Sequence, residues 1–175
     1  MAYPLERYIE DVIKNLQTCL YLRNFPSLKI ERHNKPEVET RESAELLMPE
    51  INIKRSEKEK CMIEPSINSA RVSFLLKKND DLDRFLTSMF IRFISLRAEE
   101  FYILRRLAVT GFDISFLFTH VHLEELAREQ LMAFLRTFLK EIDKEISEMR
   151  ITVNTRARAA ATFFVSNLIP RTTPS

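Results

Sequence analysis

The sequence predicts an α+β fold in two layers, with one antiparallel sheet, flanking helices and a long C-terminal helix. Several predicted strands, one of which alternates apolar and polar residues, are joined mostly by hairpin-length connections, which favours antiparallel pairing. Apolar residues recur at helical spacing at both ends of the chain and once between the strands. The 175 residues, of which 45% are hydrophobic, suffice for one core. We therefore expect a single domain over residues 1–170 and a flexible tail over residues 171–175.

The first part of the chain predicts a helix and then a long connection. Residues 4–21 place apolar side chains on one side of a helix, and Pro4 suits the first helical position, where its missing N–H is not needed. We expect a short strand at residues 28–30. Residues 31–50 are polar and include two prolines, which predicts a mostly irregular connection on the surface.

Three strands and a helix are predicted next. The strands are expected at residues 51–54, 61–64 and 70–77, with a charged turn at residues 55–60 between the first two. Asn79 or Asp80 can cap the helix, because its side-chain oxygen accepts an N–H of the first turn. The apolar stripe of this helix comprises Leu82, Phe85, Leu86, Met89, Phe93 and Leu96, and is thickened by Phe90 and Ile94.

A second hairpin is predicted around the only glycine of the chain, Gly111. Strands at residues 100–106 and 112–119 flank the turn, in which glycine supplies a positive φ. The lack of other glycines excludes the glycine-rich phosphate-binding loops.

The longest helical pattern spans residues 122–149 and contains no glycine or proline. A helix of that length measures roughly 40 Å, which exceeds what one sheet face needs. It is therefore either a long core helix or a helix that also docks against a partner chain. A final helix begins at a cap, Asn154, and ends before Pro170.

No residue pattern predicts catalysis. His120 and His122 are close in sequence, but a zinc site needs three or four ligands and no further Cys or His has a suitable spacing. Cys19 and Cys61 lie far apart, and the charged N-terminus does not resemble a signal peptide, so we expect an intracellular location. No apolar run reaches the roughly 20 residues of a membrane span.

Basic residues form local clusters although the net charge is only +2. This balance argues against general nucleic-acid binding. Each cluster alone is typical of a solvated turn or helix end, but together they would suit an acidic protein surface if they converge. The clusters are Lys54, Arg55, Lys58 and Lys60; Arg105 and Arg106; and Arg150, Arg156 and Arg158.

Long segments of the chain resemble one protein family, that of subunit 4, the small α/β subunit, of the actin-related protein 2/3 complex. The segments are ERHNKPEVE at residues 31–39, SEKEK and IEPSINSARVS at 56–60 and 63–73, RAEEFYILRR and GFDISFL at 97–106 and 111–117, and EIDKEISEMRITVNTRAR at 141–158. The chain departs from the family pattern at Pro65, Leu107 and His120, and its tail from Ile169 onward runs beyond the usual end.

The resemblance implies a non-catalytic scaffold subunit without a cofactor, located in the cytoplasm at branched actin networks of the cell cortex. It implies a core formed with subunit 2, contacts with other subunits of the complex, and binding to the mother actin filament during branched nucleation. The implied filament-binding residues are Arg55, Arg105, Arg106, Arg150, Arg156 and Arg158. The implied partner-facing residues of the long helix are Leu131, Phe134, Leu135, Phe138, Leu139, Ile142 and Ile146.

Two other functions fit parts of the sequence. The long helix could make the chain an independent α+β binding module that self-associates. The basic turn at residues 54–60 could bind RNA, although no aromatic residues interleave the arginines and the net charge is near neutral.

Overall fold

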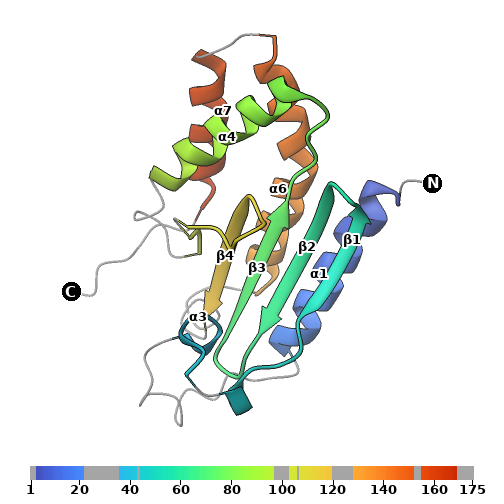
Figure 1. Ribbon diagram of the computed structural model, residues 1–175, viewed down its shortest axis with the longest axis vertical. Helices are drawn as coiled ribbons and strands as arrows, with labels where there is room; N and C mark the ends of the chain where they lie inside the picture. The colour runs from blue at the N-terminus through green and yellow to red at the C-terminus, as the bar shows by residue number, and fades with distance from the viewer. Residues whose placement is uncertain are drawn as a thin grey trace.

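The fold is a four-stranded antiparallel sheet with flanking helices, which confirms the predicted α+β class (Figure 1). The computed structural model describes residues 3–21, 36–42, 44–96, 103–105, 107–119, 128–151 and 155–168. The strand order is β1-β2-β3-β4. The strands are β1 (Ile51–Ser56), β2 (Glu59–Pro65), β3 (Ser69–Leu75) and β4 (Ile114–Thr119).

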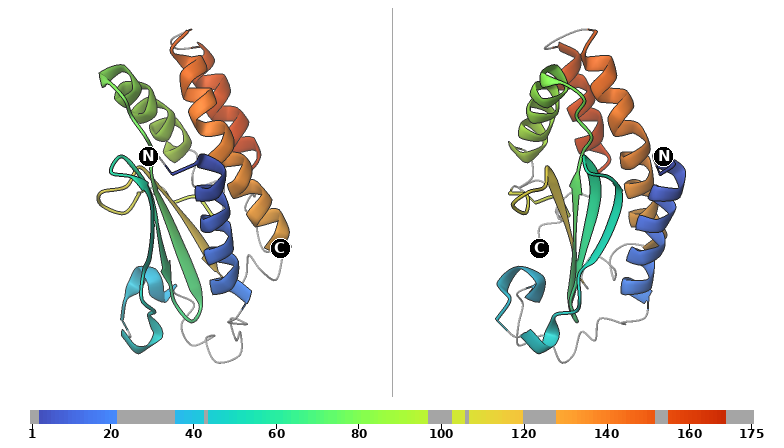
Figure 2. Two further views of the ribbon diagram at one scale, coloured as in Figure 1. Left: turned by 90° about the vertical axis from the view of Figure 1, so that its right-hand side faces the viewer. Right: turned by 45° about the vertical axis from the view of Figure 1, so that its right-hand side comes forward.

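The helices divide between the sheet and one end of the molecule. Figure 2 shows α1 and α6 on one face of the sheet and α3 on the other, while α4 and α7 pack with α6 beyond the end of the sheet. The helices are α1 (Leu5–Tyr21), α3 (Glu37–Thr40), the 3-10 turn η1 (Ala44–Leu46), α4 (Asp81–Leu96), α6 (Arg128–Met149) and α7 (Thr155–Ser166). Among the helices of the described ranges, none combines the length and apolarity needed to span a membrane.

One aromatic residue, Phe138 of α6, joins the sheet to the end of the molecule at which α4, α6 and α7 pack together, which we call the three-helix end. Alternate residues of the strands point toward α1 and α6, which buries Phe74 of β3 and Phe116 of β4 almost completely. The Phe138 ring lies 6.2 Å from Phe74, 5.3 Å from Phe116 and 5.6 Å from Phe164 of α7, measured between ring centroids. The core is therefore continuous from the sheet into the helices.

The first hairpin has longer strands and a shorter turn than predicted. Lys54 pairs with Lys60 and Ser56 with Glu59, so only Glu57 and Lys58 remain in the turn. The charges do not end the strands, because Arg55 and Glu59 form an ion pair across the hairpin.

The connection predicted to be irregular contains ordered turns where the structure describes it. The N–H of Glu37 donates to Oδ1 of Asn68, and Val38 is buried, which holds α3 against the β2–β3 turn. The predicted strand at residues 28–30 lies outside the described residues.

The second hairpin is confirmed in its turn and only in part in its strands. Gly111 has φ 90°, as its predicted role requires. Of the strand predicted at residues 100–106, only 103–105 are described, and there Leu104 forms an isolated bridge with Phe116.

The apolar face predicted for α4 is wrong in part. Leu86, Phe90 and Ile94 are buried, whereas three residues of the predicted stripe stay exposed. The reason is that α4 packs on α7, with Phe90 and Phe164 5.4 Å apart between ring centroids, and this contact sets the rotation of the helix. The exposed residues are Leu82 (41%), Phe85 (54%) and Leu96 (63%). The predicted Asp80 cap is confirmed, because its Oδ1 accepts the N–H of Asp83 at 2.8 Å.

Helix α6 has 22 residues within the predicted span of 122–149. Residues 122–127 and the predicted cap Asn154 lie outside the described ranges. The predicted final helix is confirmed as α7, in which Ala160, Ala161 and Phe164 are buried, as is Leu168 just after the helix.

Candidate functional site

Arg55 lies on the edge strand β1 and is committed to contacts within the chain. Its Nη1 lies 2.8 Å from Oε2 of Glu59, and its Nε donates to the carbonyl of Tyr3 at 2.7 Å. Its side chain is only 19% exposed. Arg55 therefore ties the first hairpin to the start of α1 and offers little free donor capacity.

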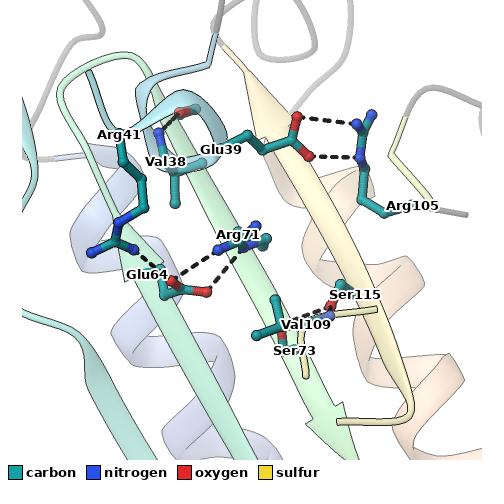
Figure 3. Close-up of polar contacts among 10 residues, drawn as sticks. Val38, Glu39, Arg41, Glu64, Arg71, Ser73, Arg105, Val109 and Ser115 are labelled. Atoms are coloured by element: carbon teal, nitrogen blue, oxygen red, sulfur yellow. Dashed lines mark hydrogen bonds and ion pairs between the residues drawn. The ribbon is translucent and has the colours of Figure 1, made fainter. Parts of the chain in front are cut away.

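Arg105 forms a two-pronged ion pair with Glu39 of α3, drawn in Figure 3. Nε lies 2.7 Å from Oε1 and Nη2 lies 3.0 Å from Oε2. The backbone N–H of Arg105 donates to the carbonyl of Ser115, which fixes this residue beside β4. The geometry matches the planar fork of guanidinium to a carboxylate, so Glu39 already occupies the face that an external acid would bind.

A second carboxylate on the same sheet face holds two further arginines (Figure 3). Glu64 accepts from Nε and Nη2 of Arg71 at 2.9 and 3.0 Å and from Nη1 of Arg41 at 3.2 Å. The Glu64 side chain is 9% exposed, whereas Arg41 is largely in solvent. The sequence analysis did not identify Glu64 or Glu39 as partners of the arginines. The one signal in the sequence was the carboxylate of Glu64 inside the apolar strand predicted at residues 61–64.

Arg150 joins the end of α6 to the start of α4. Its guanidinium lies 2.9 Å from Oδ2 of Asp80 and 2.6 Å from Oδ1 of Asp83. The backbone N–H of Asp83, and then the Arg150 guanidinium, hold the pKa of the Asp80 carboxyl below its usual range. The same hydrogen bonds raise the pKa of Arg150.

The described arginines do not form one compact patch. Arg55 and Arg105 lie at opposite edges of the sheet, and Arg150 lies beyond it, at the far end of α6 (Figure 1). Arg158 is exposed on α7. Arg106 and the side chain of Arg156 lie outside the described residues. A partner that touched all of these positions would need a broad surface.

The residues predicted to face a partner helix lie mainly in the core of this chain. Six of them are buried: Leu131, Leu135, Phe138, Leu139, Ile142 and Ile146. Phe134 is the half-buried member of the set. Their contact with subunit 2 stays a prediction, and their own surroundings already bury most of the predicted stripe.

A groove between α6 and α7 offers a more accessible apolar surface that sequence reasoning missed. Phe163 of α7 is 51% exposed on its rim, and the buried Phe138 and Phe164 also line it. The groove has a volume of about 250 Å³, and its other lining residues are Gln130, Ala133, Phe134, Thr137 and Asn167. A further hollow of about 320 Å³ shares Phe163 and continues toward Glu145, Glu148, Met149, Ala159 and Ala160. We call these two hollows together the α6–α7 groove.

Of the candidate reactive groups, the structure describes the two cysteines. Cys61 is buried, and burial raises the pKa of its thiol, which disfavours the nucleophilic thiolate. His120 and His122 lie outside the described residues. Within the part of the chain that the structure describes, no group of three or more His, Cys, Asp or Glu side chains is placed to hold a metal ion.

Comparisons with known proteins identify the family of this chain. Residues 1–167 match the family model of the ARP2/3 complex 20 kDa subunit (ARPC4). A probable actin-related protein 2/3 complex subunit 4 of Caenorhabditis elegans is 46% identical, over 94% of this chain and 98% of its own length. The actin-related protein 2/3 complex subunits 4 of Saccharomyces cerevisiae and Dictyostelium discoideum are 42% and 43% identical, over 97% and 91% of this chain and 99% and 95% of their own lengths. The chain therefore belongs to the family of the ARP2/3 complex 20 kDa subunit.

Proposed function

We propose that this chain is a non-catalytic scaffold subunit of the actin-related protein 2/3 complex. In this role it pairs with subunit 2 and contacts the mother actin filament during branched nucleation, in the cytoplasm at the actin cytoskeleton. The observation that carries the proposal is the family match over residues 1–167, which covers all helices and strands of the described residues.

The α6–α7 groove supports the pairing with subunit 2. The two helices run in opposite directions (Figure 1), and Phe134 and Phe163 expose apolar surface to the groove between them. An apolar groove between two helices is the form that accepts the apolar face of a third helix. Phe134 and Phe138, two of the seven predicted partner-facing residues, line this groove. We therefore assign the long helix of subunit 2 to it.

The basic residues support the filament contact to different degrees. We assign this contact to Arg55, Arg105, Arg106, Arg150, Arg156 and Arg158, as the family resemblance implies. Arg55, Arg105 and Arg150 each have an internal carboxylate partner. Arg158 is exposed and has no carboxylate within ion-pair distance among the described residues. Arg158 is therefore the most available, for an acidic filament surface, of the assigned arginines that the structure describes.

Co-expression with subunit 2, followed by size-exclusion chromatography with light scattering, tests the pairing. The wild-type chain should form a one-to-one complex. Phe163→Asp should abolish it, because a charge would be buried without a partner. Thr162→Asp is the matched control, since it adds the same charge at the neighbouring exposed position outside the groove. A wild-type chain that stays monomeric beside subunit 2 would reject the proposal.

Co-sedimentation of the assembled complex with actin filaments tests the filament contact. Arg158→Glu should weaken binding, because repulsion replaces attraction at an exposed rim position. Lys140→Glu makes the same charge reversal at an exposed position of α6 outside the assigned set. Equal losses in both variants would show that only the net charge matters.

A further inference from the structure

A pair of fully buried serines lies on the outer face of the sheet, which is the face opposite α1 and α6 (Figure 3). Ser73 of β3 and Ser115 of β4 are register partners, and their hydroxyl oxygens lie 2.8 Å apart. Burial of a hydroxyl is unfavourable unless the group is hydrogen-bonded. The two hydroxyls satisfy each other in part, and Ser115 has further partners.

Ser115 holds both ends of the segment between Arg105 and Val109, which we call the arginine loop. Its carbonyl accepts the N–H of Arg105 at 2.9 Å, and its hydroxyl oxygen accepts the N–H of Val109 at 3.1 Å. A hydroxyl can donate one hydrogen bond and accept two, so Ser115 can bond Ser73 and Val109 at the same time. An apolar side chain at position 115 would suit a buried strand but would leave the Val109 N–H without this acceptor.

The arginine loop extends into solvent, whereas the chain that follows it is fixed to the sheet by other contacts. Leu107 is 87% exposed, and the Arg105 side chain is 37% exposed. After the loop, the N–H of Asp113 donates to the carbonyl of Phe74 at 2.9 Å. Loss of the Ser115 hydroxyl would therefore loosen the arginine loop and leave the start of β4 in place.

We propose that Ser115 is a positioning residue for filament binding, which holds the arginine loop in the shape that presents Arg105 to the mother filament. This inference rests on the proposed function, which assigns Arg105 to the filament contact. Because Ser115 is fully buried within this chain, it acts through the two N–H groups that it binds and not by contact with the filament.

The contribution of such an anchor is pre-organisation. A loop that is bound at both ends populates fewer conformations, so less conformational entropy is lost when a partner binds to it. If only the anchored shape binds the filament, the apparent dissociation constant rises as the anchored fraction falls. One hydrogen bond of ordinary strength changes that equilibrium by about 2- to 13-fold, which sets the scale of the expected effect.

Co-sedimentation of the assembled complex with actin filaments at two salt concentrations tests the inference. Ser115→Ala should weaken binding by up to about 13-fold and make it less sensitive to salt, because Arg105 would contribute less of its attraction. Ser73→Ala is the matched control, since it shortens an equally buried serine and breaks the same bond between hydroxyls but keeps the bond from Val109. This control should bind filaments as the wild type does.

Two further variants distinguish positioning from a general loss of stability. In a complex that already carries Arg105→Gln, Ser115→Ala should cause little further loss, because two residues that act through one contact do not have additive effects. Ser115→Thr keeps the hydroxyl, so it should bind filaments more tightly than Ser115→Ala, even where its extra methyl group lowers the melting temperature.

The possible failures are distinguishable. The inference would be overturned by unchanged binding in Ser115→Ala, by equal losses in Ser73→Ala and Ser115→Ala, or by a loss that persists in full beside Arg105→Gln. A Ser115→Ala chain that no longer assembles with subunit 2 would also overturn it, since Ser115 would then serve the fold itself. A wild-type complex that does not bind filaments would instead reject the proposed filament contact.

Discussion

The sheet with α1 and α3, and the three-helix end formed by α4, α6 and α7, differ in what they expose. In the sheet region several arginines are paired with carboxylates of the chain, as in Arg55 with Glu59 and Arg105 with Glu39. Five of the six exposed large hydrophobic residues in the described ranges lie on or directly beside the three helices. The sheet region therefore pairs several of its arginines internally, and the three-helix end exposes more apolar surface.

This difference changes where a partner surface should be sought. Clusters of arginine in the sequence predicted a positively charged binding surface. In the structure, however, Arg55, Arg105 and Arg150 form ion pairs with carboxylates of the same chain. Surface ion pairs contribute little to stability, about 0–1 kcal/mol, so pairing does not prevent the partly exposed Arg105 and Arg150 from binding, but it lowers the gain from each. Phe85 and Phe163 are 54% and 51% exposed, so burying the remainder of each ring offers roughly half of the about 1.5–3 kcal/mol of a fully exposed side chain.

The largest expected effect distinguishes Phe138, a core residue that joins the two regions, from Phe163, a half-exposed surface residue. Phe138→Ala should destabilise the chain by about 3–5 kcal/mol, because it removes a buried ring that contacts Phe74, Phe116 and Phe164. Phe163→Ala should change stability by less than about 1 kcal/mol, because half of this side chain is already in solvent. Urea unfolding of the purified variants measures both. Similar losses would show that Phe163 is part of the core.

The next effect tests whether the sheet region depends on its buried carboxylate. Glu64→Gln should cost about 2 kcal/mol, because it removes a charged acceptor and leaves the Arg71 guanidinium without its ionic partner. Arg41→Gln is the control at the exposed end of the same network and should cost less than about 0.5 kcal/mol. The midpoint of urea unfolding reports both values. A larger loss for Arg41→Gln would reverse the assigned order within the network.

Local patterns were enough to predict most elements. The strands β2 and β3, the cap Asp80 and the turn at Gly111 depend on neighbours in sequence, and the structure confirms them. The rotation of α4 was not predictable, because apolar residues surround more than half of the helix and only the contact with α7 selects the buried side.

The ion pairs of the arginines could not be predicted from local sequence patterns either. Glu39 and Arg105 are 66 positions apart, and Asp80 and Arg150 are 70 positions apart. No spacing rule links residues at such separations, so the sequence located the clusters of positive charge but not the carboxylates that neutralise them.

The link between α4 and α6 should depend on pH. The folded pKa of Asp80 lies below the value in the unfolded chain, so its pairing stabilises the fold above about pH 4 and is lost as the pH falls through the folded pKa. The melting temperature of Arg150→Gln should therefore lie below that of the wild type near neutral pH, and the gap should close in acid. Circular dichroism melts over a pH series measure the gap. A constant gap would mean that Arg150 acts through packing and not through the Asp80 charge.

The smallest expected effect concerns the charge pairing of the sheet region itself. Glu39→Gln releases Arg105 from its ion pair but leaves α3 held by Val38 and by the bond from the Glu37 N–H to Asn68. If Arg105 contributes to filament binding, the variant complex should bind filaments about 1.4- to 5-fold more tightly, which corresponds to the about 0.2–1 kcal/mol of an exposed pair.

Glu42→Gln is the matched control for this measurement, because it removes the same charge from an exposed position three residues further along. Co-sedimentation at two salt concentrations should show tighter binding for Glu39→Gln alone, with the difference greatest at low salt, where charges are screened least. Equal changes in both variants would assign the effect to net charge. Weaker binding by Glu39→Gln would show that Glu39 orients Arg105 toward the filament and does not compete with the filament for Arg105. The ion pair of the sheet region would then prepare a binding surface and would not neutralise one.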